Sequence, residues 1–162
     1  PGSSIGNFTP SQALGFLSSL HTACGNASPS GLLIGVDLLK RADELEAAYD
    51  DALGVTAAFN LNLLLHINRL VGSDFAVRDW QHLSRFNAEQ SRVEMHLQAR
   101  HAVRVQWPGG ERVFAAGETI HTENACKWTV SGFDALLRSA GFKGTRSWTD
   151  PAARFAVFWA TA

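Results

Sequence analysis

The apolar positions near the N-terminus follow two different periods. Thr9-Pro10 is typical of a helix start, with Thr as the N-cap and Pro at the first helical position, and apolar residues at helical spacing follow as far as about Gly25. Residues 3–8 predict a short strand before this helix. A turn over residues 28–31 and the continuous apolar run 32–36 follow it, and the run predicts a strand buried on both faces of a parallel sheet. The order predicts a βαβ unit.

The pattern changes in the middle of the chain. Residues 42–49 predict a short helix and residues 56–71 a longer one. From Arg92 apolar and polar residues alternate, so that residues 93, 95 and 97 share one face of a strand and residues 94, 96 and 98 share the other. The alternation continues to a turn over residues 108–110, with a return strand from Val113. These features predict an antiparallel sheet flanked by helices.

The last third of the chain returns to alternating helix and strand. Residues 122–127 predict a polar loop, and Ser131 is the expected N-cap of a helix that Gly141 closes. Two strands are expected afterwards, around residues 145–149 and 155–159. The fold class is therefore α/β, interrupted by an α+β section.

Composition and charge exclude several classes of protein. Of 162 residues, 46% are hydrophobic and 18% charged, which favours a buried core over disorder. The formal net charge of −1, with no evident basic face, argues against a nucleic acid or membrane partner. No apolar run approaches the roughly 20 residues that span a bilayer, and no signal peptide is evident. Cys24 and Cys126 are expected to be reduced thiols in a cytoplasmic protein, with a disulfide as the alternative.

The histidines raise the question of a metal site. His96, His101 and His121 are the nearest group, but His96 and His101 differ by five positions on one strand and so face opposite ways. His21 and Cys24 stand at helical spacing without an evident carboxylate partner. No C-x-x-C, H-E-x-x-H, P-loop or G-x-G-x-x-G pattern occurs. We therefore expect no metal and no catalytic nucleophile.

Several short motifs are unremarkable alone but informative in series. In order they are S-S-I-G-N-F, A-Y-D-D, G-V-T-A-A-F-N-x-N, R-x-E-M-H-L, G-E-x-I-x-T-E-N-x-x-K and A-G-F. This series resembles the histidine-specific methyltransferase family, which supplies the first enzyme of ergothioneine biosynthesis. The resemblance implies the C-terminal part of a class I, Rossmann-like sheet, closed by a hairpin that places an antiparallel strand inside it. Residues 1–38 and 128–162 would form this core, and residues 39–127 an inserted substrate-binding domain.

The resemblance also implies a substrate site. Asn7, expected at the carboxyl end of a strand, would contact the substrate amino group, and Tyr49 the substrate carboxylate. Glu123 would accept a hydrogen bond from the imidazole, and Met95 would line the pocket. Ala125 stands where the family usually has a Ser that adds a second imidazole contact.

The implied reaction transfers methyl groups from S-adenosylmethionine to the α-amino group of L-histidine, giving trimethylhistidine (hercynine). The main cofactor-binding motif is absent from this chain, so an N-terminal half is expected, with a separate partner chain as one alternative. Two alternatives to the function stay open. One is a methyltransferase for another amino acid or for a histidine thiol derivative. The other is a non-catalytic fragment that lacks the cofactor site.

Overall fold

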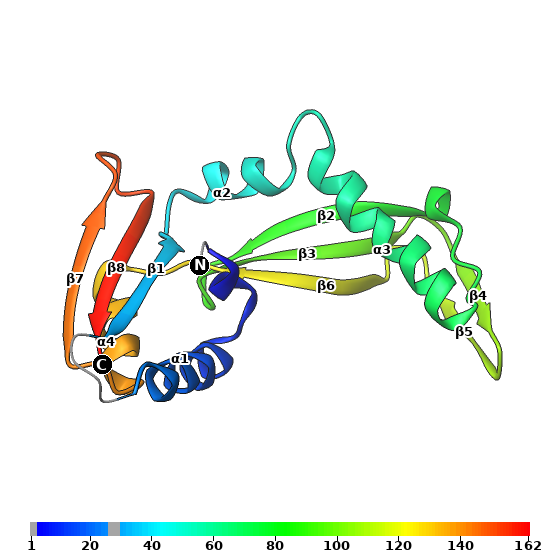
Figure 1. Cartoon of the computed structure of the whole chain (residues 1–162). Coiled ribbons are helices and arrows are strands. Elements are labelled where there is room, and N and C mark those ends of the chain that lie inside the picture. The colour runs from blue at the N-terminus through cyan, green and yellow to red at the C-terminus, as the bar shows by residue number, and fades with distance from the viewer. Residues whose placement is uncertain (1–2, 26–29) are drawn as a thin grey trace. The chain divides into compact units, whose positions relative to one another are not determined.

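The structure is a computed structural model that describes residues 3–25 and 30–162. The chain has a mixed α/β fold (Figure 1). It divides into two compact units. The first comprises Pro1–Arg41, Asn87–Arg92 and Asn124–Ala162, and the second Ala42–Phe86 and Val93–Glu123. Within the described part of the chain, none of the helices combines the length and the apolar character that a membrane-spanning helix requires.

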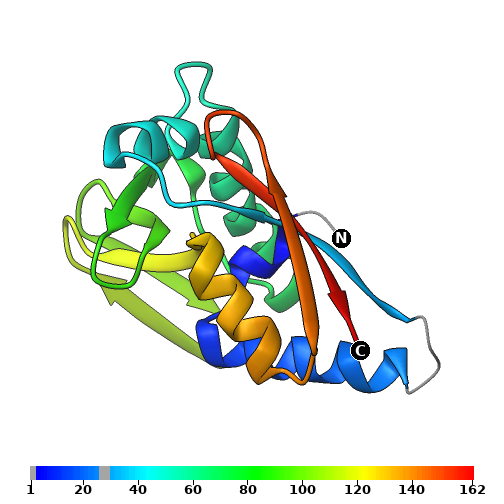
Figure 2. The same ribbon diagram turned by 90° about the vertical axis from the view of Figure 1, so that its left-hand side faces the viewer.

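The first unit contains a sheet in which the last strand lies between the other two. The order is β1 (Gly31–Asp37), β8 (Phe155–Thr161) and β7 (Gly144–Thr149) (Figure 2). β8 pairs antiparallel with both neighbours. The predicted closing hairpin, with an antiparallel strand inside the sheet, is thus confirmed. The parallel partner expected for residues 32–36 in the predicted βαβ unit, residues 3–8, is not a strand, and β1 pairs with β8 in the antiparallel sense.

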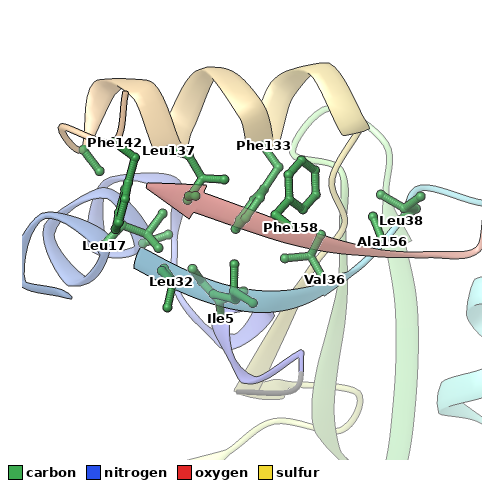
Figure 3. Packing of buried hydrophobic residues seen from close by; sticks show 14 residues of the cluster. Ile5, Leu17, Leu32, Val36, Leu38, Phe133, Leu137, Phe142, Ala156 and Phe158 are labelled. Atoms are coloured by element: carbon green, nitrogen blue, oxygen red, sulfur yellow. The ribbon is translucent and has the colours of Figure 1, made fainter. Parts of the chain in front are cut away.

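One face of this sheet carries the core of the first unit. Leu17 from α1 (Pro10–Cys24) and Phe133 from α4 (Val130–Ser139) pack with Val36 and Phe158 of the strands (Figure 3). Leu33, on the opposite face, is 55% exposed. The prediction that residues 32–36 are buried on both faces is therefore wrong. A continuous apolar run fits a one-sided antiparallel strand equally well when nothing covers the second face.

The segment before α1 is not a strand. Ser4–Asn7 forms a 3-10 helix, η1, in which the backbone amide of Gly6 donates to the carbonyl of Ser3 at 2.9 Å. Ile5 is buried in the core of the first unit, and Asn7 is exposed. The predicted strand over residues 3–8 and the βαβ unit built on it are both wrong. The predicted turn over residues 28–31 lies partly outside the described residues.

Helix α1 begins where the sequence predicts. Thr9 is its N-cap, Pro10 is its first residue, and the side chains and backbones of Thr9 and Gln12 form a capping box. α4 begins differently from the prediction. Its N-cap is Thr129, whose Oγ1 accepts a hydrogen bond from the amide of Gly132 at 3.0 Å, and Ser131 lies inside the helix. Thr and Ser are both good N-cap residues, so residue type alone does not decide between Thr129 and Ser131. Thr129 is the N-cap because its backbone is extended, as that position requires.

The second unit combines two helices with strands. α2 (Ala42–Tyr49) and α3 (Val55–Val71) confirm the predicted helices. β4 (Val103–Trp107) pairs antiparallel with β5 (Gly110–Phe114) around the predicted turn. The unit's core is formed by one residue of α3 together with residues of the strands: Leu64, Trp80, Leu97, Ala99, Val103, Val105 and Phe114.

A further sheet has the order β2–β3–β6. β3 (Arg92–Ala99) was predicted. β2 (Trp80–Asn87) was not, because its polar and apolar residues do not alternate cleanly. A 3-10 turn, η2 (Val77–Asp79), precedes β2. β6 is Thr119–Cys126, so the motif T-E-N lies on a strand and not on the predicted polar loop. Strand pairing satisfies the backbone hydrogen-bonding groups of the motif. The strand also fixes the direction in which the side chain of Glu123 points.

Candidate functional site

The second unit contains a pocket of about 250 Å³ between α3 and β6. Its lining combines apolar side chains with amides, an imidazole and a carboxylate. The lining residues are Phe59, Asn60, Asn62, Leu63, His66, Thr122 and Glu123. The volume lies below the ~300–1,000 Å³ typical of pockets for drug-sized ligands, which suits a small molecule such as an amino acid.

Two of the predicted site residues, Met95 and Glu123, lie on the neighbouring strands β3 and β6. The hydroxyl of Thr122 donates to the carbonyl oxygen of Met95 at 2.9 Å. This bond ties the backbone of Met95, which is 4% exposed, to the residue that precedes Glu123. The carbonyl of Glu123 in turn lies 3.2 Å from Nε2 of His121. The backbone around Glu123 is therefore held by the side chains of the two β6 residues that precede it.

The backbone of Tyr49 is joined to the pocket through two polar side chains, those of His82 and Asn60. Its carbonyl oxygen lies 2.8 Å from Nε2 of His82, and Nδ1 of His82 lies 3.0 Å from Nδ2 of Asn60. Asn60 also donates from Nδ2 to the carbonyl of His96 at 3.1 Å. Because a carbonyl only accepts, Nε2 of His82 carries the proton and Nδ1 accepts from Asn60. Asn60, which is 3% exposed, thus links the pocket wall to the end of α2.

The second Asp of the motif Y-D-D anchors the start of α3. The carboxylate of Asp51 accepts from the backbone amides of Thr56 at 2.8 Å and Val55 at 3.0 Å. These bonds lower the pKa of Asp51 from its usual 3.8 to about 2. The chain reaches α3 through Gly54, whose φ of 68° lies in the left-handed region. Asp51 therefore positions the helix that forms one wall of the pocket.

The remaining predicted site residues belong to the first unit. Asn7 is exposed at the end of η1, and Ala125 is buried on β6. Tyr49, Met95 and Glu123 belong to the second unit. Tyr49 is tied by hydrogen bonds to a residue of the pocket, and Glu123 lines it. The joint contact of all five residues with one substrate stays a prediction.

The Lys of the motif T-E-N-x-x-K has a structural contact in the first unit. The side chain of Lys127 is 2% exposed, and its Nζ donates to Asp37 Oδ2 at 2.8 Å. Lys40 also pairs with Asp37. Burial works to raise the pKa of Asp37, but the hydrogen bonds from Lys127 and Lys40 hold this pKa below its usual value. This pairing joins the end of β1 to the segment after β6.

The described residues do not form the usual main contact with S-adenosylmethionine. A nucleotide-type cofactor on a doubly wound sheet is held by a glycine-rich turn from strand to helix. Here the connections from β1 to α2 and from β6 to α4, residues 38–41 and 127–129, contain no glycine. Gly109 and Gly110 lie at the hairpin of β4 and β5. No cofactor-binding residue is therefore assigned within the described ranges.

The expected absence of a metal site rested on His96 and His101. The structure instead brings Glu94, His96 and His121 together, with one potential ligand atom of each within 4.8 Å of the others. The sequence signal was present as Glu94-x-His96, a spacing of two that places both side chains on one face of a strand. Sequence reasoning missed it because His121 arrives from β6, whose pairing with β3 was not predicted.

The comparisons with known proteins agree on one family. The sequence model of a family described as histidine-specific methyltransferase, SAM-dependent, matches residues 1–162. Histidine N-alpha-methyltransferases from Mycolicibacterium smegmatis and Mycobacterium tuberculosis are 44% identical over 158 residues and 43% identical over 159 residues. Each of these matches covers 96% of this chain and 49% of the relative. An L-tryptophan methyltransferase from Psilocybe serbica is 29% identical over 164 residues, covering 96% of this chain and 44% of the relative.

The chain spans about half the length of the curated relatives it matches. Each relative carries the matched region within a longer chain. The comparisons therefore give no support to a separate chain as the partner of this one.

Proposed function

Because the chain belongs to the histidine-specific, SAM-dependent methyltransferase family, we propose that the protein containing it methylates the α-amino group of L-histidine, with S-adenosylmethionine as the methyl donor. Three successive transfers would give trimethylhistidine. The observation that carries the proposal is the place of Glu123, the Glu of the motif T-E-N, in the lining of the 250 Å³ pocket. A carboxylate in such a pocket suits a substrate with an imidazole N–H.

In this proposal, residues of the pocket and residues that the family resemblance implies would contact separate parts of histidine. The carboxylate of Glu123 would accept a hydrogen bond from the imidazole, which fixes the ring and disfavours an amino acid without a ring N–H. Phe59 and Leu63 give apolar walls on α3. Met95 would give one on β3, as the family resemblance implies. Tyr49 and Asn7 would hold the carboxylate and the amino group of the substrate, as the family resemblance implies.

S-adenosylmethionine supplies an electrophilic methyl group on a sulfonium centre. The contribution of this chain's residues is to orient the substrate so that the neutral amine presents its lone pair in line with that methyl group. Orientation alone can supply a large share of the rate, because a fixed amine does not lose translational and rotational freedom in the transition state. The polar contacts of Tyr49 and Asn7 with the amino acid backbone would provide that orientation without adding charge.

The architecture supports a division of labour between the two units. A three-stranded sheet with antiparallel β8 between β1 and β7 is what the closing part of a Rossmann-like methyltransferase sheet requires. We propose that residues 1–38 and 128–162 belong to that sheet. Residues 39–127 would then form an inserted substrate-binding domain, since Tyr49, Met95, Glu123 and the pocket all lie between those limits.

A substrate panel tests the proposal. The purified protein containing this chain is incubated with S-adenosylmethionine and, separately, with histidine, tryptophan, phenylalanine or a histidine thiol derivative, and products are identified by mass spectrometry. We expect mono-, di- and trimethylhistidine to form in succession. Methylation of none of these amino acids would contradict the proposal and support the non-catalytic alternative.

A second candidate is a methyltransferase for another amino acid. Ala125 removes the second polar contact with the imidazole that the family's Ser makes, and a relative of this chain is named L-tryptophan methyltransferase. Loss of one hydrogen-bonding group changes selectivity by about 1–3 kcal/mol, enough to reverse a narrow preference. Faster turnover of tryptophan or of the thiol derivative than of histidine in the same panel would favour this candidate.

A further inference from the structure

Three potential metal ligands gather on the β3 and β6 strands of the second unit. Glu94 and His96 lie two residues apart on β3 and share one face, with Oε2 of Glu94 and Nε2 of His96 separated by 3.2 Å. His121 comes from β6, and its ring stacks on that of His96 with centroids 4.7 Å apart and an interplanar angle of 22°. Each residue has one potential ligand atom within 4.8 Å of the others.

Two of the three residues are buried. Glu94 and His96 are each 8% exposed. The ring of His96 directs Nε2 at Glu94, while its Nδ1 is buried and has no hydrogen-bond partner among the described residues. A buried polar atom without a partner costs free energy, so the ring is not fully satisfied by protein groups alone. The nitrogen of this ring that faces the carboxylate of Glu94 is Nε2, and Nε2 is therefore the potential ligand atom beside that carboxylate.

The ring of His121 has the support that metal-binding imidazoles usually have. Its Nε2 lies 3.2 Å from the carbonyl oxygen of Glu123, which requires the proton on Nε2. The other nitrogen then carries a lone pair. A hydrogen bond from one ring nitrogen to a backbone carbonyl, with the second nitrogen free to coordinate, is the usual second-shell arrangement of a metal-binding histidine.

We propose that Glu94, His96 and His121 bind a first-row divalent cation, of which Zn²⁺ is the representative probe. Two imidazoles and one carboxylate suit zinc and its neighbours in the first row, whereas magnesium prefers an all-oxygen set.

The geometry needs one small adjustment. Zinc–nitrogen and zinc–oxygen bonds of about 2.0–2.2 Å place tetrahedral ligand atoms roughly 3.3 Å apart. The 3.2 Å between Glu94 and His96 already matches this spacing. His121 is exposed, and its ring would have to turn out of the stack with His96 to aim Nδ1 at the cation, while solvent would complete the coordination.

The test is titration of the purified, chelator-treated protein with ZnCl2 by calorimetry. We expect saturable binding of one ion per chain. His121→Ala changes an exposed residue and should weaken binding at least tenfold, and Glu94→Gln should do the same while keeping the side chain's shape. The matched control is His101→Ala, an exposed histidine of the same unit that pairs with Asp79, and it should leave the affinity unchanged. MgCl2 should give no binding heat.

A second readout uses stability. A cation that binds only the folded protein raises its melting temperature, so Zn²⁺ should raise that of the wild type and of His101→Ala but not that of His121→Ala. Three results would overturn the proposal: no saturable zinc binding, equal loss in His121→Ala and His101→Ala, or full affinity in His121→Ala. Because His121 lies on the surface, the test does not depend on a buried substitution that could unfold the protein.

Discussion

Replacing Asn60 by Ala should destabilise the second unit through two lost hydrogen bonds. Nδ2 of Asn60 donates to Nδ1 of His82 and to the carbonyl of His96, and the residue is 3% exposed. Water cannot readily replace a donor at such a site. Each bond contributes about 1 kcal/mol, so the free energy of unfolding should fall by about 2 kcal/mol. The link between the pocket and the carbonyl of Tyr49 would be lost at the same time.

Urea unfolding, followed by circular dichroism, measures this change. With a urea dependence of about 2 kcal/mol per molar, the midpoint should fall by about 1 M. Asn62→Ala is the matched control, since Asn62 lies on the same helix and lines the same pocket but is exposed, and it should change stability by less than about 0.5 kcal/mol.

Asn60→Asp separates hydrogen bonding from packing. This variant keeps the size of the side chain but places a carboxylate oxygen where the amide donated to the carbonyl of His96, so it should be at least as unstable as Asn60→Ala. Wild-type stability in Asn60→Asp, or equal effects of Asn60→Ala and Asn62→Ala, would refute the reasoning.

Three further predictions concern the elements that position the site. Thr129→Ala should lower the melting temperature by removing the N-cap of α4, at a cost of about 1 kcal/mol, while Ser131→Ala should have little effect; the reverse order in a thermal melt would restore Ser131 as the cap. Asp51 has a lowered pKa of about 2, so its contribution is fully present above about pH 4 and is lost as the pH falls toward 2. The difference in melting temperature between wild type and Asp51→Asn should therefore shrink over that range, and a constant difference would contradict this anchor for α3. Asp37→Asn removes a carboxylate partner of the buried Lys127 and should destabilise the first unit by up to about 3 kcal/mol, more than Lys127→Met, as measured by urea unfolding.

The sequence predicted best the elements whose local signals agree with their packing. Thr9-Pro10 fixed the start of α1 because a capping hydroxyl and a proline act within one turn of the helix. The hairpin of β4 and β5 was predicted from alternation and from Gly109, whose φ of 96° suits a turn. In both cases the decisive interactions lie within a few residues along the chain.

The errors come from interactions between distant segments. The apolar run over residues 32–36 did not reveal that its partner would be β8, in the antiparallel direction, or that Leu33 would stay exposed. The strand over residues 3–8 became a 3-10 helix, in which Ile5 alone enters the core. Neither outcome is encoded in local propensity, because each depends on which segment covers which face.

The candidate site also combines residues that the sequence predicted with residues that only the contacts between distant segments reveal. Motif order indicated Glu123, Tyr49 and Met95, and the structure adds the pocket that Glu123 lines and the network that holds the backbone of Tyr49. Asn60 and His82 were not singled out as site residues, since their connection spans 22 residues and exists only once α3 lies against the sheet. The cluster of Glu94, His96 and His121 was missed because two strands contribute to it.

The most direct test of the proposed function is the turnover of histidine by Glu123→Ala in the protein containing this chain. We assign the imidazole contact to the Glu123 carboxylate, and removing the partner of a polar group that the bound substrate buries costs about 1–3 kcal/mol, or up to about a hundredfold in kcat/KM. Ala125→Ser, assayed in parallel, should retain or raise the kcat/KM for histidine. The account predicts that Glu123→Ala loses most of its activity toward histidine while its melting temperature stays near that of the wild type. Histidine turnover within twofold of the wild type would contradict the account.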